Sequence, residues 1–183
     1  LAIDHDPYCE QVYKKNLPTT NFVLQNLSQI NKKIFLGLKP DVVVGGPPCQ
    51  GFSTIGSRIS SIEKKREKKD IRNNLVFSFI EHVNYLNPKI FLMENVSGIL
   101  TRDKGEIFHE LTKKIKNFGY KYEVFKLDAV NYGVPQFRKR VFIIGTKDEK
   151  YKISKPNITH GENFLLEEEI KIITAAKRVN IID

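Results

Sequence analysis

The chain has 183 residues, which is enough for one domain with a sizeable core and too few for two comfortable domains. Hydrophobic residues make up 40% of it, with 12 phenylalanines, and this excludes a disordered chain. It has no run of about 18 apolar residues and no signal-peptide pattern at Leu1, so nothing indicates a membrane span or secretion. The net charge of +9 suits nucleic acid, an acidic surface or a lysine-rich genome.

The cysteines indicate the compartment, and the local charge indicates the binding partner. Cys9 and Cys49 are too few for a disulfide framework, and no cysteine–histidine spacing is typical of a metal site. We therefore expect a reduced, cytoplasmic compartment and no metal. Residues 51–74 carry seven Lys/Arg against three acids, directly after Cys49. This local excess of positive charge favours nucleic acid as the partner.

In chain order, the first half alternates short strands and helices. An apolar segment ends at Asp4, and Asp6-Pro7 is typical of a helix start, which predicts a helix over 7–16. A short strand over 21–24 and a short amphipathic helix over 28–36 follow. Residues 41–45 are almost continuously apolar, which predicts a buried parallel strand.

The second half continues the alternation after a loop over 51–72. Helices are expected at 74–86 and 105–118, and strands at 89–93, 122–127 and 140–146. Strands that alternate with helices indicate an α/β fold with a mostly parallel sheet. The pattern loosens after Lys147, so we expect one α/β domain over 1–147 and a tail over 148–183.

Three chemically suggestive residues follow predicted strands, at the carboxyl ends where open α/β sheets bind ligands. Asp4 suits a ribose hydroxyl of an adenosine-containing cofactor, or a helix cap. Cys49 follows two glycines and two prolines that make a rigid turn, and beside basic residues a thiol can act as a nucleophile; the alternative is a buried structural cysteine. Glu94 suits a proton donor or one side of an ion pair. Cys9 is expected in the core.

A further charged run precedes the last predicted strand. The alternation of an extended segment places Gln136, Arg138 and Arg140 on one face, with Arg140 nearest the sheet. Two arginines on one face suit contacts with phosphate or carbonyl oxygens, or else form a solvated charged edge.

Four motifs stand in order along the chain: DVVVGGPPCQGFS at 41–53, DIRNNL at 70–75, ENV at 94–96 and VPQFRKR at 134–140. Their order and relative spacing resemble those of the cytosine-C5 DNA methyltransferases. The resemblance covers Leu1 to about Gly145. It implies a Rossmann-like methyltransferase fold, incomplete at its N-terminus, that uses S-adenosylmethionine.

The resemblance also assigns roles at the site. It implies that Cys49 is the nucleophile that adds to C6 of a flipped cytosine, so that C5 can attack the methyl group. Glu94 would contact N3 and the exocyclic amine, and Arg140 would hold O2 with support from Arg138. Further substrate contacts implied are Gln50, Ser53, Asn95 and Gln136.

For the cofactor, the resemblance implies Asp4 as the ribose ligand and His5 against adenine. Asn26 and Leu27 would also contact adenine, with asparagine replacing the usual aspartate. The remaining lining positions implied are Pro47 and Leu75.

The resemblance raises expectations about the whole protein. Its substrate would be double-stranded DNA in a restriction–modification context, at the bacterial nucleoid. The family's glycine motif is expected before Leu1, and its last motifs and recognition region after Asp183. We therefore expect a fragment, a truncated chain or a split subunit with a complementary partner, which alone binds S-adenosylmethionine weakly and methylates little.

Three alternatives stay open. Some tRNA cytosine-C5 methyltransferases share this scaffold and resemble the Thr54-Ile55-Gly56 continuation. The chain could also be a non-catalytic nucleic-acid-binding fragment. A cysteine hydrolase would need a histidine beside Cys49, and His82 and His109 lie within predicted helices instead.

Overall fold

The computed structural model describes residues 1–48 and 75–160. The chain opens with strand β1 (Ala2–Asp4), helix α1 (Pro7–Asn16) and strand β2 (Phe22–Leu24), and the two strands pair in parallel. Helix α1 begins where the sequence predicts, because the Asp6 carboxylate accepts the Tyr8 amide at 2.8 Å and a proline occupies the first turn.

The amphipathic helix expected over 28–36 is absent from this described segment. Two short 3-10 helices, η1 (Leu27–Gln29) and η2 (Lys32–Phe35), stand in its place. Each follows an asparagine, Asn26 or Asn31, whose side-chain oxygen accepts an amide two residues later. Asparagine competes with the helix for backbone donors in this way, so the segment becomes two capped turns.

The main sheet has four strands in the order β3-β4-β6-β5. They are β3 (Val42–Gly45), β4 (Ile90–Asn95), β5 (Lys121–Asp128) and β6 (Lys139–Thr146). β3 and β4 are parallel, whereas β6 runs antiparallel to both β4 and β5. The α/β class is confirmed, and among the described strands two pairs are parallel, β1–β2 and β3–β4, and two are antiparallel, β4–β6 and β5–β6.

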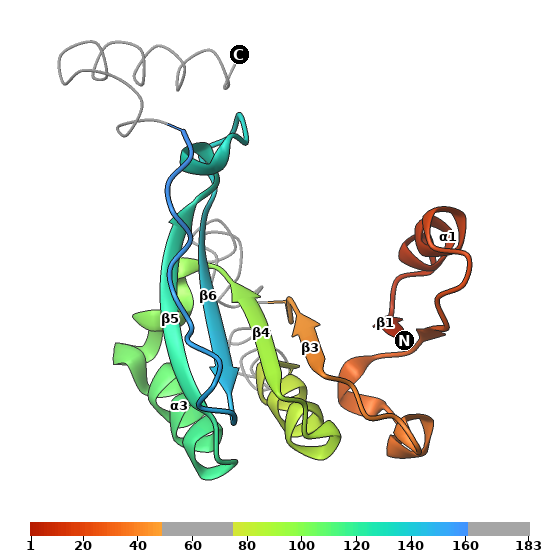
Figure 1. The fold of residues 1–183 in the computed structure, drawn as a ribbon. Coiled ribbons are helices and arrows are strands. Elements are labelled where there is room, and N and C mark those ends of the chain that lie inside the picture. Colours follow the sequence, from red (N-terminus) through yellow and green to blue (C-terminus); the bar gives the residue numbers. More distant parts are fainter. Residues whose placement is uncertain (49–74, 161–183) are drawn as a thin grey trace, which may run out of the picture.

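The core lies between one face of this sheet and two helices (Figure 1), one over 75–86 and α3 (Glu106–Asn117). Both helices form where predicted. The largest fully buried side chains are Phe91, Ile80, Met93, Ile99, Leu111, Ile115 and Ile143. The burial pattern of β4 alternates strictly, so Phe91 and Met93 face the helices and Glu94 faces the other way.

A glycine in β6 makes room for the largest core ring. Gly145 pairs with Phe91 across the β4–β6 ladder, and a Cβ on it would come within 2.1 Å of the Phe91 ring. The ring packs edge-to-face on Tyr120 at 5.2 Å, and the Tyr120 hydroxyl donates to the Pro88 carbonyl at 2.8 Å. Burial raises the pKa of Tyr120 to about 12.

Three further short helices connect these elements: η4 (Ser97–Leu100), η5 (Arg102–Gly105) and η6 (Ala129–Tyr132). After β6 the chain turns back and runs along β5 and β6 to η6, at the end of the sheet where β4 finishes (Figure 1). Within 1–48 and 75–160, no helix is long and apolar enough to cross a bilayer.

Candidate functional site

Strand register brings Glu94 and Arg140 together. Glu94 lies opposite Phe142 in the antiparallel β4–β6 pair, and Arg140 precedes Phe142 by two residues, so it points to the same face. Arg140 Nε lies 2.7 Å from Glu94 Oε1 in an ion pair, and the two side chains are 23% and 34% exposed. The pair lies at the rim of the sheet, where a ligand can still reach it. Of the two roles expected for Glu94, the ion pair is present.

The turn that leaves β3 lies beside this pair. Gly45 pairs with Met93, so the next residue, Gly46, reaches the level of Glu94. A Cβ on Gly46 would lie 3.5 Å from Glu94 Oε2, which is an ordinary contact. The second carboxylate oxygen of Glu94 therefore faces the backbone of the glycine turn.

The side chain of Asn95 holds that turn through a hydrogen bond. Its side-chain amide donates to the Pro47 carbonyl at 3.3 Å, and its oxygen accepts the Val96 amide at 2.9 Å. Asn95 is only 2% exposed, so this geometry gives it a supporting role where a substrate contact was predicted. Pro47 is buried as well, while Pro48 is exposed.

Cys49, Gln50 and Ser53 lie outside the described residues, and their predicted roles stay predictions. The described chain nevertheless leads to within one residue of Cys49. Gly46 to Pro48 leave β3 on the rim that carries Glu94 and Arg140, and this places the start of the predicted nucleophile turn beside the ion pair.

Gln136 and Arg138 lie in the loop before β6, and both are exposed. The backbone of Arg138 is held twice, because its amide donates to Asp128 Oδ1 at 3.0 Å and its carbonyl accepts the Ala129 amide at 3.1 Å. Only Arg140 of the three predicted residues belongs to the strand. Its Nη1 also donates to the Lys139 carbonyl at 2.9 Å.

Asp4 ends β1 as predicted. Its Oδ1 accepts the Asp6 amide at 3.0 Å and lies 3.3 Å from His5 Nδ1, with Asp4 and His5 side chains 42% and 72% exposed. Cys9, expected in the core, is only half-buried. Burial, followed by the negative charges of Asp4 and Asp6 and a hydrogen bond with Asp4, raises the pKa of Cys9 above its ordinary value.

Asn26 and Leu27 differ in what they can offer a cofactor. The Asn26 oxygen already accepts the Ser28 amide at 3.0 Å and the Ser28 hydroxyl at 2.9 Å, so accepting from an adenine amine would require releasing one of them. Leu27 is half-buried against the core. Its carbonyl lies 2.9 Å from Nε2 of His82, which ties it to the same helix that Leu75 begins.

The side chains of Asp4, Leu27 and Leu75 suit an adenosyl group in their chemistry. An exposed carboxylate on Asp4 suits ribose hydroxyls, and the half-buried side chains of Leu27 and Leu75 suit a flat apolar ring. The role of His82 has no sequence signal, because the histidine reaches a carbonyl 55 residues earlier in the chain.

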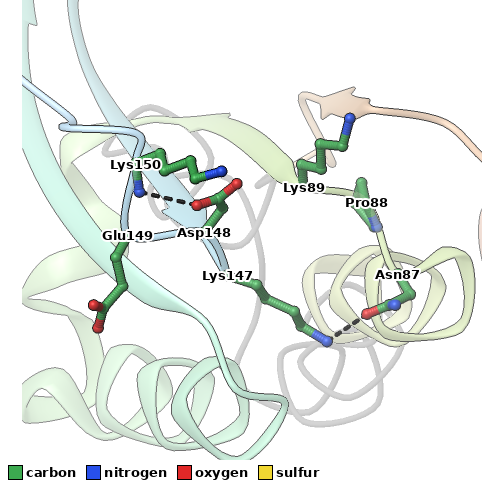
Figure 2. A pocket seen from close by; sticks show the side chains of 7 residues that line it. All are labelled: Asn87, Pro88, Lys89, Lys147, Asp148, Glu149 and Lys150. Atoms are coloured by element: carbon green, nitrogen blue, oxygen red, sulfur yellow. Dashed lines mark hydrogen bonds between the residues drawn. The ribbon is translucent and has the colours of Figure 1, made fainter.

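The opposite end of the sheet carries a shallow recess between the segments 87–89 and 147–150 (Figure 2). Lys147 donates to Asn87 Oδ1 at 2.5 Å, and the Lys150 amide donates to Asp148 Oδ1 at 2.9 Å. These residues precede β4 or follow β6, so the recess lies away from Glu94 and Arg140. Two other charged residues that line it form ion pairs outside the recess, Lys89 with Asp41 and Glu149 with Lys121.

Comparison with known proteins agrees with the motifs. A family model described as C-5 cytosine-specific DNA methylase matches residues 1–181. Type II methyltransferase M.DdeI of Desulfomicrobium norvegicum is 38% identical over 156 residues, which cover 82% of the chain and 35% of that protein. Type II methyltransferase M.AquIA of Picosynechococcus sp. is 37% identical over 175 residues, covering 88% of the chain and 67% of that protein.

Solved structures agree in fold. A prophage-encoded DNA modification methyltransferase from E. coli superposes with a TM-score of 0.66 at 31% identity, covering 83% of the chain and 41% of that protein. DNMT2 of Spodoptera frugiperda gives a TM-score of 0.64 at 24% identity, covering 91% and 52%. The chain thus spans about a third of M.DdeI and half or less of the E. coli structure. On the family model and these identities, the chain belongs to the C-5 cytosine-specific DNA methylase family.

Proposed function

We propose that the protein containing this chain transfers a methyl group from S-adenosylmethionine to C5 of cytosine in DNA. The observation that carries the proposal is the 2.7 Å pair of Glu94 and Arg140 at the rim where the turn toward Cys49 leaves β3. A carboxylate and a guanidinium side by side match the edge of cytosine, which presents an amine, a ring nitrogen and a carbonyl oxygen.

Each partner keeps groups for the base. Arg140 pairs with Glu94 on its Nε side and donates from Nη1 to the Lys139 carbonyl, and its other N–H groups can donate to O2 of cytosine. Glu94 Oε2, which faces Gly46, can accept from the exocyclic amine. The ion pair holds both side chains in place before the base binds, so little conformational entropy is lost when they contact it.

The covalent step falls to Cys49. Its thiolate bonds to C6, the C5=C6 electron pair becomes available at C5, and negative charge spreads toward N3 and O2, where Glu94 and Arg140 stabilise it. S-adenosylmethionine, which Asp4, Leu27 and Leu75 would hold, would supply the methyl group: the electron pair at C5 would form the new C–C bond as the methyl–sulfonium bond breaks, leaving S-adenosylhomocysteine. Loss of the C5 proton to a base and cleavage of the S–C6 bond then restore the ring and the thiolate. The cytosine must first leave the duplex, because neither face of C6 is accessible within the stack.

DNA is favoured over tRNA as the substrate because the related proteins are named Type II methyltransferases and the family description specifies DNA. The same names support a restriction–modification context. The exposed Gln136 and Arg138 would contact the DNA beside the flipped base.

Covalent trapping tests the proposal in the protein at its natural length. Duplex DNA containing 5-fluorocytosine, with S-adenosylmethionine present, should give a complex stable to SDS, because fluorine cannot leave C5 as a proton does. Cys49→Ser should abolish the complex, and Glu94→Gln should slow its formation by about 10²-fold or more. The same analogue in tRNA should give no complex; trapping on tRNA alone would overturn DNA as the substrate.

A matched control separates chemistry from the loss of an ion pair. Glu81 on the helix over 75–86 also pairs with a cation, Lys114, at 2.7 Å, with similar partial exposure. Glu81→Gln should trap DNA at the wild-type rate. If Glu81→Gln and Glu94→Gln slow trapping equally, the loss reflects the fold, and the role proposed for Glu94 is wrong.

A further inference from the structure

Residues 156–160, which follow β6, form a strap that is fastened to η6. The carbonyl of Asn131 accepts two amides of the strap, from Thr159 at 3.1 Å and from His160 at 3.0 Å. The Tyr132 hydroxyl donates to the Pro156 carbonyl at 3.3 Å. Three hydrogen bonds therefore join the strap to η6.

The His160 ring lies against the residue that ends this turn. Gly133 has φ +86°, in the left-handed region that favours glycine, and a Cβ there would lie 2.7 Å from Cε1 of the His160 ring. The Thr159 hydroxyl lies 3.0 Å from His160 Nδ1 and fixes the ring orientation. Glycine is thus required at 133 both for its backbone conformation and for the approach of the ring.

The turn fastened by the strap leads directly into the site. Its amide at Val134 donates to the Ala129 carbonyl at 3.2 Å, and the Gln136 amide donates to the Val134 carbonyl at 2.7 Å. Beyond Gln136, Arg138 is held to Asp128 and Ala129 at the end of β5. The loop is therefore fixed on one side by β5 and on the other by the strap, with Val134 and Phe137 exposed between them.

We propose that Thr159 and His160 are positioning residues for substrate: the strap holds the η6 turn so that Gln136 and Arg138 are presented to DNA in one conformation. The inference rests on the proposed function, which gives Gln136 and Arg138 their DNA contacts. Without the His160 ring over Gly133, the loop samples several conformations. The conformational entropy lost in ordering it on DNA then weakens DNA binding. Glu94 and Arg140 stay on their strands, so the chemical step is spared.

His160→Ala in the natural-length protein tests the inference, with His109→Ala on the exposed face of α3 as the matched control. We expect hydrogen exchange at the Val134 amide to quicken about tenfold or more in His160→Ala while the global melting temperature stays near wild type. The apparent KM for mixed-sequence unmethylated duplex DNA should rise about tenfold with kcat within about twofold. His160→Phe, which keeps a flat ring over Gly133, should restore most of the KM.

The outcomes are distinct. Faster exchange with an unchanged KM would make the strap a purely structural device and overturn the inference. A fall in kcat equal to the rise in KM would also overturn it, because the strap would then act on chemistry. A wild-type protein that does not methylate DNA would overturn the proposed function first, and this inference with it.

Discussion

Adjacent glycines at the end of β3 offer a sharp test of the site, because they have different neighbours. A Cβ on Gly45 would lie 2.3 Å from Cε2 of Phe79, a core ring that is 5% exposed. A Cβ on Gly46 would lie 3.5 Å from Glu94 Oε2, within ordinary contact distance. Gly45→Ala should therefore disturb the core and Gly46→Ala the site.

The geometry sets the magnitudes. In Gly45→Ala, the Phe79 ring must retreat by about 1 Å before it reaches even a close contact, and overpacking of this kind costs about 1–3 kcal/mol. For a domain of this size that lowers the melting temperature by roughly 5 °C. Gly46→Ala meets no clash and should change the free energy of unfolding by no more than about 0.5 kcal/mol.

Thermal unfolding and 5-fluorocytosine trapping, measured on both variants, separate the two effects. Gly46→Ala should melt like wild type but trap DNA about tenfold more slowly, because its methyl group stands beside the oxygen proposed to accept the cytosine amine. Gly45→Ala should melt early and trap normally well below its melting temperature. A wild-type melting temperature for Gly45→Ala would refute the packing argument, and normal trapping by Gly46→Ala would refute the orientation given to Glu94.

Two further predictions concern perturbed groups. Because the pKa of Tyr120 is raised to about 12 from 10.0, unfolding releases a proton between those pH values, so the free energy of unfolding should fall as the pH rises through that range. Tyr120→Phe should remove this pH dependence. At neutral pH the same variant should lower the free energy of unfolding by about 1–2 kcal/mol, because it leaves the Pro88 carbonyl without the hydroxyl that donates to it. Denaturant unfolding at several pH values measures both effects. The raised pKa of Cys9 predicts that its thiol is alkylated slowly near pH 8. Asp4→Asn should speed the alkylation because it removes a negative charge and a hydrogen bond, whereas the control Glu10→Gln should not. Peptide mapping after iodoacetamide treatment measures the rates, and equal rates in the two variants would contradict this explanation.

Local features of the fold were predictable from sequence because they depend on neighbours in the chain. Asp6 and the proline after it define the start of α1, and the apolar stripe of α3 defines its buried face. Polar side chains that act locally caused the clearest error. Asn26 and Asn31 each cap a 3-10 turn where the apolar spacing of 28–36 suggested one helix.

The sequence indicated candidate site residues but not the contacts between them. The motif order pointed to Glu94 and Arg140, but their ion pair depends on the antiparallel register of β4 and β6, which the alternation of a single strand cannot specify. Asn95 illustrates the same limit. Its motif position suggested a substrate contact, whereas strand alternation turns it to the buried face, where it braces Pro47.

The backbone segments that carry the candidate site residues differ in rigidity, and the difference matches the roles proposed for those residues. Glu94 and Arg140 stand on β4 and β6, where a continuous ladder of paired residues holds their backbones. Gln136 and Arg138 stand on a loop that depends on the strap and on Asp128. Charge that develops on a ring during reaction needs donors fixed to within a fraction of an ångström, which strands provide. Contacts to a DNA backbone require less precise placement, so a loop held at two points is sufficient for them, and it lies apart from the strands that carry the residues acting on the base.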